Sequence, residues 1–154
     1  MTADIRTTMW KAMADSPNVM VNLTAKYQHA EPMRAQLDED ADSEFWFYTT
    51  KTNRIAEGGE AMVQFASKGH DVFACIRGVL VKEDRQEIID KYWSNAVEAW
   101  YEKGKEDPSL QMMRLELKDA EIWQADPGFK GIFKMLRGKN VEPEEMGEHE
   151  KVNL

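Results

Sequence analysis

Alternating hydrophobic and polar positions predict a protein built mainly of short β-strands. Two neighbouring stretches, 33–37 and 45–48, carry the clearest signals. In the first, hydrophobic residues alternate with polar ones, as in a strand with one buried face. In the second every residue is aromatic, so both faces must be covered and the strand belongs inside a sheet or barrel. The acidic residues 38–42 predict an exposed turn, and we expect the two strands to form a hairpin.

The same patterns predict the other elements. A helix opens the chain, because its hydrophobic residues recur on one side, and Asp15-Ser16-Pro17 ends it. Asp84-Arg85-Gln86-Glu87 resembles a capping box and predicts a second helix, with a third helix after it that ends at Gly104. The inward positions of the three helices are Ile5, Met9, Trp10 and Met13, then Ile88, Ile89, Tyr92 and Trp93, then Val97, Trp100 and Tyr101. Further strands are predicted at 19–24, 62–67, 72–81, 113–117 and 120–124.

A strand-to-helix corner is the first candidate for a ligand site. The aromatic strand runs into Thr49 to Arg54, small polar residues that lead to a short helical stretch and a stop at Gly58-Gly59. Such corners collect unpaired backbone N–H groups at a helix start and suit a phosphate.

Composition restricts the classes of protein that remain. The chain has 154 residues and a net charge of -8, without a run of basic residues, which argues against a nucleic-acid partner. No apolar run is long enough to cross a membrane, and the single cysteine, Cys75, fits a reducing compartment, so we expect a cytoplasmic protein. The three histidines lack carboxylates at ligand spacing, and we predict no metal site.

These patterns favour one mainly β domain, a small antiparallel barrel with peripheral helices, over residues 1–138. Residues 139–154 are acidic and poor in hydrophobic residues. We expect them to form a mobile tail, or an arm that orders on a partner.

An ordered set of residues resembles the bacterial general stress proteins of the pyridoxamine 5′-phosphate oxidase-like superfamily. The similarity runs from about Trp10 to about Gly138. Its pieces are His29 to Gln36 with Pro32-Met33, then Trp46-Phe47-Tyr48-Thr49 with Arg54, Phe65-Ala66, Phe73 to Gly78, Trp93, Trp100-Tyr101, Gly104, Asp107-Pro108 and Glu121-Ile122-Trp123.

This resemblance implies a six-stranded antiparallel split β-barrel of Greek-key type, with helices at the N-terminus and after the fifth strand. It also implies a homodimer with FMN in the groove between the subunits. By position, the strand that carries Pro32, Met33, Arg34 and Gln36 would run beside the flavin ring and ribityl chain. Tyr48, Thr49, Lys51 and Arg54 would hold the phosphate, while Phe73 and Trp123 would lie near the ring, Trp123 from the partner subunit.

Three departures from the family pattern bear on function. Glu31 stands where many relatives carry an arginine, and a carboxylate near a phosphate is unfavourable unless it points away. Ile55 replaces a basic residue at the corner. Phe129-Lys130-Gly131 lacks the Arg-x-His of the oxidases, which argues against pyridoxamine phosphate oxidase activity.

Three functions therefore stay open. The first is an FMN-dependent oxidoreductase that takes electrons from a nicotinamide cofactor and passes them to an unidentified acceptor. The second is a non-enzymatic module that stores or senses flavin. The third keeps the barrel but changes the ligand to haem or a deazaflavin, with His29 or His70 as the axial ligand of haem. The aromatic residues also allow a purely structural role, which we expect for Trp93 and Trp100 and leave open for Trp123.

Overall fold

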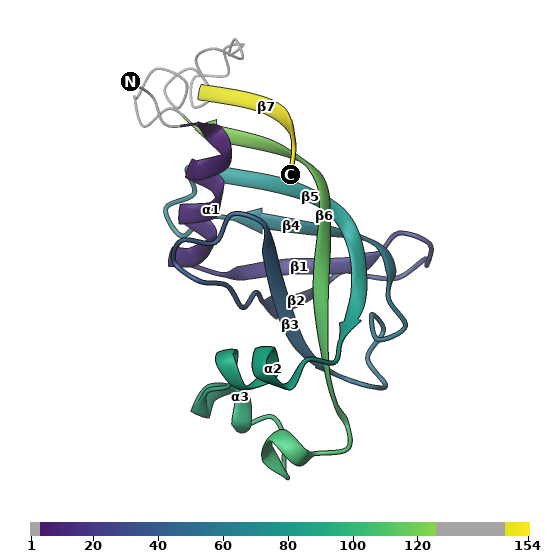
Figure 1. Ribbon diagram of the computed structural model, residues 1–154. Coiled ribbons are helices and arrows are strands. Elements are labelled where there is room, and N and C mark those ends of the chain that lie inside the picture. The colour runs from purple at the N-terminus through teal and green to yellow at the C-terminus, as the bar shows by residue number, and fades with distance from the viewer. Residues whose placement is uncertain (1–3, 126–146) are drawn as a thin grey trace.

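The computed structural model describes residues 4–125 and 147–154 (Figure 1). Helix α1 opens the described chain and a strongly curved sheet follows it. The bounds are α1 Ile5–Asp15, β1 Asn18–Leu23, β2 Glu31–Arg34, β3 Glu44–Thr50, β4 Gly59–Ala66, β5 Val72–Glu83, α2 Gln86–Tyr92, α3 Asn95–Glu98, a 3-10 turn at Gly104–Glu106, β6 Leu110–Ala125 and β7 Gly147–Asn153.

The strands form one antiparallel sheet in the order β2-β1-β4-β5-β6-β3, with β7 also paired to β6. The sheet is not closed into a continuous barrel. Its two ends meet only at an isolated bridge, in which Gln36 and Trp46 exchange backbone hydrogen bonds of 2.7 and 3.0 Å. The expected mainly β split barrel with peripheral helices is thus confirmed, and its seventh strand, β7, is one more than the resemblance implies.

The predicted hairpin between the stretches 33–37 and 45–48 is reduced to a single antiparallel bridge. β2 pairs with β1, and β3 pairs with β6 along its whole length. Apart from the bridge at Gln36, the two stretches do not pair with each other. Alternation correctly gave the buried face of each stretch, but it carries no information about the neighbouring strand.

The C-terminal part of the chain differs from the expected tail. β7 pairs with the second half of β6, from Asp119↔Asn153 to Ala125↔Gly147. Val152 and Leu154 also pack against the core. Residues 139–146 and the boundary at 138 lie outside the described residues. The two strands predicted at 113–117 and 120–124 are a single strand, β6, which lies between β5 on one side and β3 and then β7 on the other.

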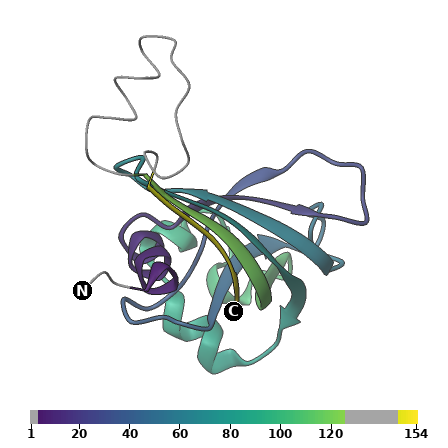
Figure 2. The same ribbon diagram turned by 90° about the horizontal axis from the view of Figure 1, so that it is seen from above.

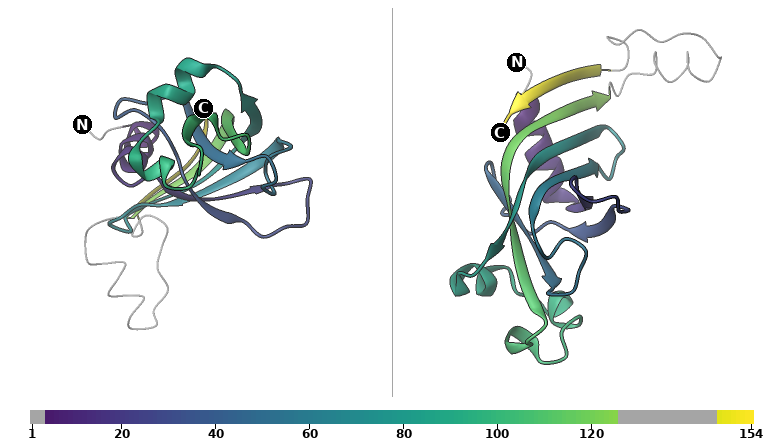
Figure 3. Two further views of the ribbon diagram at one scale, coloured as in Figure 1. Left: turned by 90° about the horizontal axis from the view of Figure 1, so that it is seen from below. Right: turned by 90° about the vertical axis from the view of Figure 1, so that its right-hand side faces the viewer.

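The three helices of the described residues lie on one side of the sheet, and no helix of these residues covers its other face (Figures 2 and 3). The predicted N-terminal helix is confirmed: the four hydrophobic residues of α1 are buried, and Trp10 packs edge-on against Phe45 of β3. The bare side, which we call the outer face, carries the exposed side chains Met20, Phe73 and Trp123. None of the helices in the described ranges is long and apolar enough to cross a membrane.

The helices after β5 are fixed by a buried carboxylate instead of the predicted capping box. Arg85, not Asp84, is the N-cap of α2, and its side chain makes no capping hydrogen bond. Glu83, which is 4% exposed, accepts hydrogen bonds from Trp46 Nε1 (3.0 Å), Arg85 Nη2 (2.7 Å) and Arg114 Nη1 (3.3 Å). This network holds the start of α2 on the barrel. It also holds the pKa of the Glu83 carboxyl at about 2, chiefly through the hydrogen bond from Arg85.

The predicted inward face of α2 is half-buried, as expected, but α3 is shorter than predicted and Trp100 lies after it with 85% of its surface exposed. Trp100 is therefore not a core residue. Trp93 packs between Tyr48 and Tyr101, with ring centroids 5.6 and 5.8 Å away, and is structural.

We expect Glu83→Gln to lower the free energy of unfolding by about 1–3 kcal/mol at neutral pH, because the substitution removes the charge that two arginines share. A carboxyl with a depressed pKa in the folded state stabilises the fold above its unfolded pKa, and this contribution is lost as the pH falls toward the folded value. The difference between the two proteins should thus be complete above about pH 5 and shrink toward pH 2. Urea unfolding at several pH values measures it.

Asp84→Asn is the matched control, since Asp84 is exposed and contacts only Lys82, at 3.5 Å, among the ion pairs of the described residues. It should change stability by less than about 0.5 kcal/mol. Equal stabilities of the Glu83→Gln variant and the parent at neutral pH would contradict the role given to this network.

Candidate functional site

The corner after β3 is a series of tight turns and not the predicted helix. Residues 51–57 make successive backbone turns, with Asn53 N–H donating to Thr50 O, Ala56 N–H to Asn53 O and Gly58 N–H to Ile55 O, each at 3.0 Å. Ile55 is fully buried and anchors the turns in the core, so it is not available to a ligand. We call residues 49–54 the corner.

Gly58 ends the series of turns that follows β3. Its φ is +73°, and a Cβ at this position would lie 2.6 Å from the carbonyl oxygen of Leu80. A side chain here would therefore be strained and would also clash with backbone.

Glu31 reaches into the corner from the start of β2. Its carboxylate accepts a hydrogen bond from Asn53 Nδ2 at 2.6 Å and pairs with Arg54 Nε at 2.9 Å. Arg54 Nη1 also donates to the carbonyl oxygen of His29 at 3.1 Å. The carboxylate that was expected to be unfavourable unless it pointed away thus points at the arginine of the corner, and it ties the corner to the chain segment before β2.

Several donors of the corner remain available to a ligand. In the described part of the chain, Arg54 Nη2 and the backbone N–H groups of Thr52 and Arg54 make no hydrogen bond. Lys51 is exposed, and the hydroxyls of Thr50 and Thr52 lie 3.4 Å apart. Hydroxyls, backbone N–H groups and cations gathered on one turn suit an oxyanion such as a phosphate.

Two residues predicted at the phosphate are turned to other partners. Tyr48 donates its hydroxyl to Ile89 O at 2.5 Å, beneath α2, and burial raises the pKa of its phenol. Thr49 is 5% exposed, and its carbonyl oxygen accepts a hydrogen bond of 2.7 Å from Tyr101, whose pKa burial raises to about 12. These contacts attach the end of β3 to Ile89 of α2 and to Tyr101.

The residues predicted beside the flavin ring follow β2. Pro32 and Arg34 are exposed, whereas Met33 is half-buried and packs against the core. Gln36 is half-buried and forms the bridge to Trp46. Since Glu31 begins the same strand, β2 brings Pro32, Met33 and Arg34 to the edge of the sheet that borders the corner.

Phe73 and Trp123 form a separate group on the outer face. They are cross-strand neighbours on β5 and β6, and each is 39% exposed. His149 of β7 stacks on Trp123, with ring centroids 4.8 Å apart and an angle of 6° between the planes. Its Nε2 lies 2.7 Å from Glu121 Oε1. Sequence reasoning missed this histidine, because its carboxylate partner lies on another strand and β7 lacks a hydrophobic pattern.

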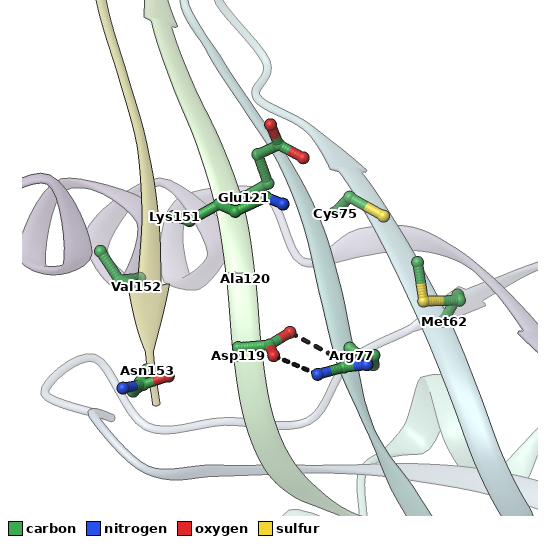
Figure 4. A pocket seen from close by; sticks show the side chains of 9 residues that line it. All are labelled: Met62, Cys75, Arg77, Asp119, Ala120, Glu121, Lys151, Val152 and Asn153. Atoms are coloured by element: carbon green, nitrogen blue, oxygen red, sulfur yellow. Dashed lines mark hydrogen bonds and ion pairs between the residues drawn. The ribbon is translucent and has the colours of Figure 1, made fainter.

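A shallow hollow of about 420 Å³ adjoins this group on the outer face (Figure 4). Arg77 and Asp119 form a two-bond ion pair across it, between β5 and β6. Met62, Cys75 and Val152 add apolar wall. Cys75 is thus partly exposed rather than a core residue, and burial together with Glu121 and Asp119 raises the pKa of its thiol.

One chain does not bring the corner and Trp123 together. Three strands, β1, β4 and β5, lie between β2 and β6. Along β6 the two groups are also far apart, because Thr50 pairs with Leu110 at the start of the strand and Trp123 stands near its end.

Comparison with known proteins shows the family of the chain. A family model described as pyridoxamine 5′-phosphate oxidase like matches residues 4–144. The chain belongs to this family. No curated protein matches the sequence.

The segment 129–131, at which the Arg-x-His of the oxidases was expected to be missing, lies outside the described residues.

Several solved structures are similar to this chain over most of its length. A general stress FMN/FAD binding protein from Xanthomonas citri is 36% identical, with a TM-score of 0.74 over 82% of this chain and 93% of that one. A protein assigned to general stress protein 26 from Jannaschia sp. CCS1 has a TM-score of 0.80 and 23% identity over the full length of both chains. A heme binding protein from Mycobacterium smegmatis, 10% identical with a TM-score of 0.63, shares the fold over 99% of this chain and 60% of its own.

We expect Gly58→Ala to lower the free energy of unfolding by about 2 kcal/mol or more, because it adds both backbone strain and a clash at the end of the corner. Gly69→Ala is the control. Gly69 has no positive φ, and its added Cβ would meet only the flexible side chain of Asp71, at 3.3 Å. Denaturant unfolding compares the two variants, and equal losses would show that the corner does not need glycine.

Proposed function

We propose that this protein binds flavin mononucleotide, with the phosphate at the corner and the flavin ring in a groove between two subunits. The carrying observation is the set of anion donors on one turn: Lys51, the Thr50 and Thr52 hydroxyls, Arg54 Nη2 and two backbone N–H groups. The 36% identical relative from Xanthomonas citri is described as an FMN/FAD binding protein, which supports flavin as the ligand. FMN carries one terminal phosphate of the kind that such a turn accommodates.

The proposal includes a homodimer, because one chain does not bring the corner and Trp123 together. We propose that the outer face, with its exposed Met20, Phe73 and Trp123, packs against a second copy of the chain. Such an arrangement brings Trp123 of one subunit toward the flavin that the corner of its partner holds. It also buries apolar surface that the described helices leave bare.

Within this site, Pro32, Met33, Arg34 and Gln36 would border the flavin ring and ribityl chain, while Phe73 and Trp123 would cover the ring.

Bound flavin supplies two-electron transfer. The chain orients the group and sets its exposure, and we propose an oxidoreductase in the cytoplasm that takes electrons from a nicotinamide cofactor. Consumption of NADH or NADPH with added acceptors tests for turnover. A flavin-loaded protein that stays inert over a broad panel is a carrier or sensor.

Haem is the weaker alternative ligand. The heme binding protein from Mycobacterium smegmatis shares the fold alone at 10% identity. His29 and His70 stand in loops and are both exposed, so neither imidazole is enclosed as the axial ligand of a bound haem would be.

A titration with FMN and with riboflavin tests the phosphate site. We expect Arg54→Ala to weaken FMN binding by about 1.5–3 kcal/mol, because it removes one charge-assisted contact, and to leave riboflavin binding unchanged. Quenching of flavin fluorescence measures both affinities. The melting temperature without ligand should stay nearly constant, since the Arg54 side chain is 45% exposed.

Arg6→Ala, which removes an exposed arginine from α1, controls for the change in net charge. Equal FMN affinity in the parent and the Arg54→Ala variant would remove Arg54 from the site. A parent protein that binds neither flavin would contradict the proposed function as a whole.

A further inference from the structure

Glu31 engages the donors of Arg54 that a phosphate ordinarily uses. An arginine grips a phosphate best with two parallel N–H groups, either Nε with one terminal nitrogen or the two terminal nitrogens together. Here Nε is paired with Glu31 Oε2 at 2.9 Å, and Nη1 donates to the carbonyl oxygen of His29 at 3.1 Å. The edge that contains Nε has thus lost a donor to Glu31, and Nη1 gives one of its two N–H groups to His29.

A second residue, Asn53, also holds the Glu31 carboxylate in place. Asn53 Nδ2 donates to the other carboxylate oxygen of Glu31 at 2.6 Å, and Asn53 Oδ1 accepts from the backbone N–H of Ile55 at 2.9 Å. Ile55 is fully buried. The Glu31 side chain, 24% exposed, is therefore fixed to the core through the corner itself and is not a surface group that can swing away at no cost.

The Glu31 carboxylate also changes the net charge that a ligand meets at the corner. Lys51 and Arg54 bring two positive charges to the corner, and Glu31 cancels one of them within contact distance. A phosphate monoester carries between one and two negative charges near neutral pH, so its attraction to the corner is reduced and it meets a carboxylate nearby. Riboflavin, which has no phosphate, is not subject to this penalty.

We propose that Glu31 is a specificity-determining residue that lowers the preference of this site for phosphorylated over unphosphorylated flavin. The inference rests on the proposed flavin site and adds to it the residue that sets its selectivity. Glu31 occupies the Nε donor of Arg54 and opposes the phosphate charge. The site therefore gains less from the phosphate group than a corner with the same two cations and no carboxylate would gain.

The test is the ratio of FMN to riboflavin affinity in the parent and in Glu31→Gln. Glutamine keeps the size of the side chain and removes its charge. We expect the affinity for FMN to rise about five-fold or more, while that for riboflavin stays within about two-fold. The gain should shrink as salt is added, because it is electrostatic. Glu31→Ala, which removes the contacts with Arg54 as well, should move the ratio in the same direction.

Glu57→Gln is the matched control. Glu57 is a second carboxylate of the same turns, but it is exposed and paired with Lys26 at 2.9 Å. Its removal should change the ratio by less than about two-fold. Circular dichroism checks that each variant is folded before the titrations.

The outcomes separate this inference from the proposed function. A ratio that is unchanged in both Glu31 variants overturns the inference and leaves flavin binding intact. A ratio that falls overturns it too, since Glu31 would then position Arg54 for the phosphate. If neither flavin binds to the parent or to any variant, the proposed function itself fails.

Discussion

The pairing of β6 with three strands is the constraint on which the rest of the molecule depends. One side of β6 is paired with β5 over most of its length, and the other side is shared by β3 and then β7. Through the first half, β6 fixes β3 and the corner that follows it. Through the second half, it places Trp123 on the outer face beside β7. A single long strand thereby determines both the location of the anion donors and their separation from the exposed tryptophan.

The corner combines a fixed backbone shape with a positive charge that Glu31 partly neutralises. Its turns are held by buried Ile55 and by Gly58, whose backbone conformation excludes a side chain. These features are independent of any ligand and preserve the shape of the site. The charged side chains are a separate contribution, and among them Glu31 partly neutralises the charge of Arg54. Under the proposed function, shape and charge therefore act on phosphate binding in opposite directions.

Local patterns predicted those parts of the fold that depend on local physics. The helix α1 and the strands β1, β4 and β5 follow directly from residue periodicity, and the residues of the corner were recognisable before its geometry was known. Partners distant in sequence were not predictable in this way. Alternation could not show that β2 pairs with β1, and β7 has too few apolar residues to be distinguished from a tail.

The errors at single residues have the same origin. Asp84 has the spacing of a cap, but its neighbour Glu83 is buried among two arginines and fixes the helix instead. Trp100 is aromatic and follows helical spacing, yet the chain leaves the helix before it and exposes the ring. Tyr48 and Thr49 are a different case: the Tyr48 hydroxyl donates to Ile89 of α2, and the carbonyl oxygen of Thr49 accepts from Tyr101. Their part in binding FMN stays a prediction.

Complementation between two variants that each bind FMN weakly is the most direct test of a site shared between subunits. Arg54→Ala damages the corner and Trp123→Ala damages the outer face, so each homodimer should bind FMN weakly. When the two chains are co-expressed and pair at random, the account predicts that about a quarter of the sites regain parental affinity, because each mixed dimer contains one corner and one tryptophan that are both intact. No regain of affinity in verified mixed dimers would contradict a site shared between subunits.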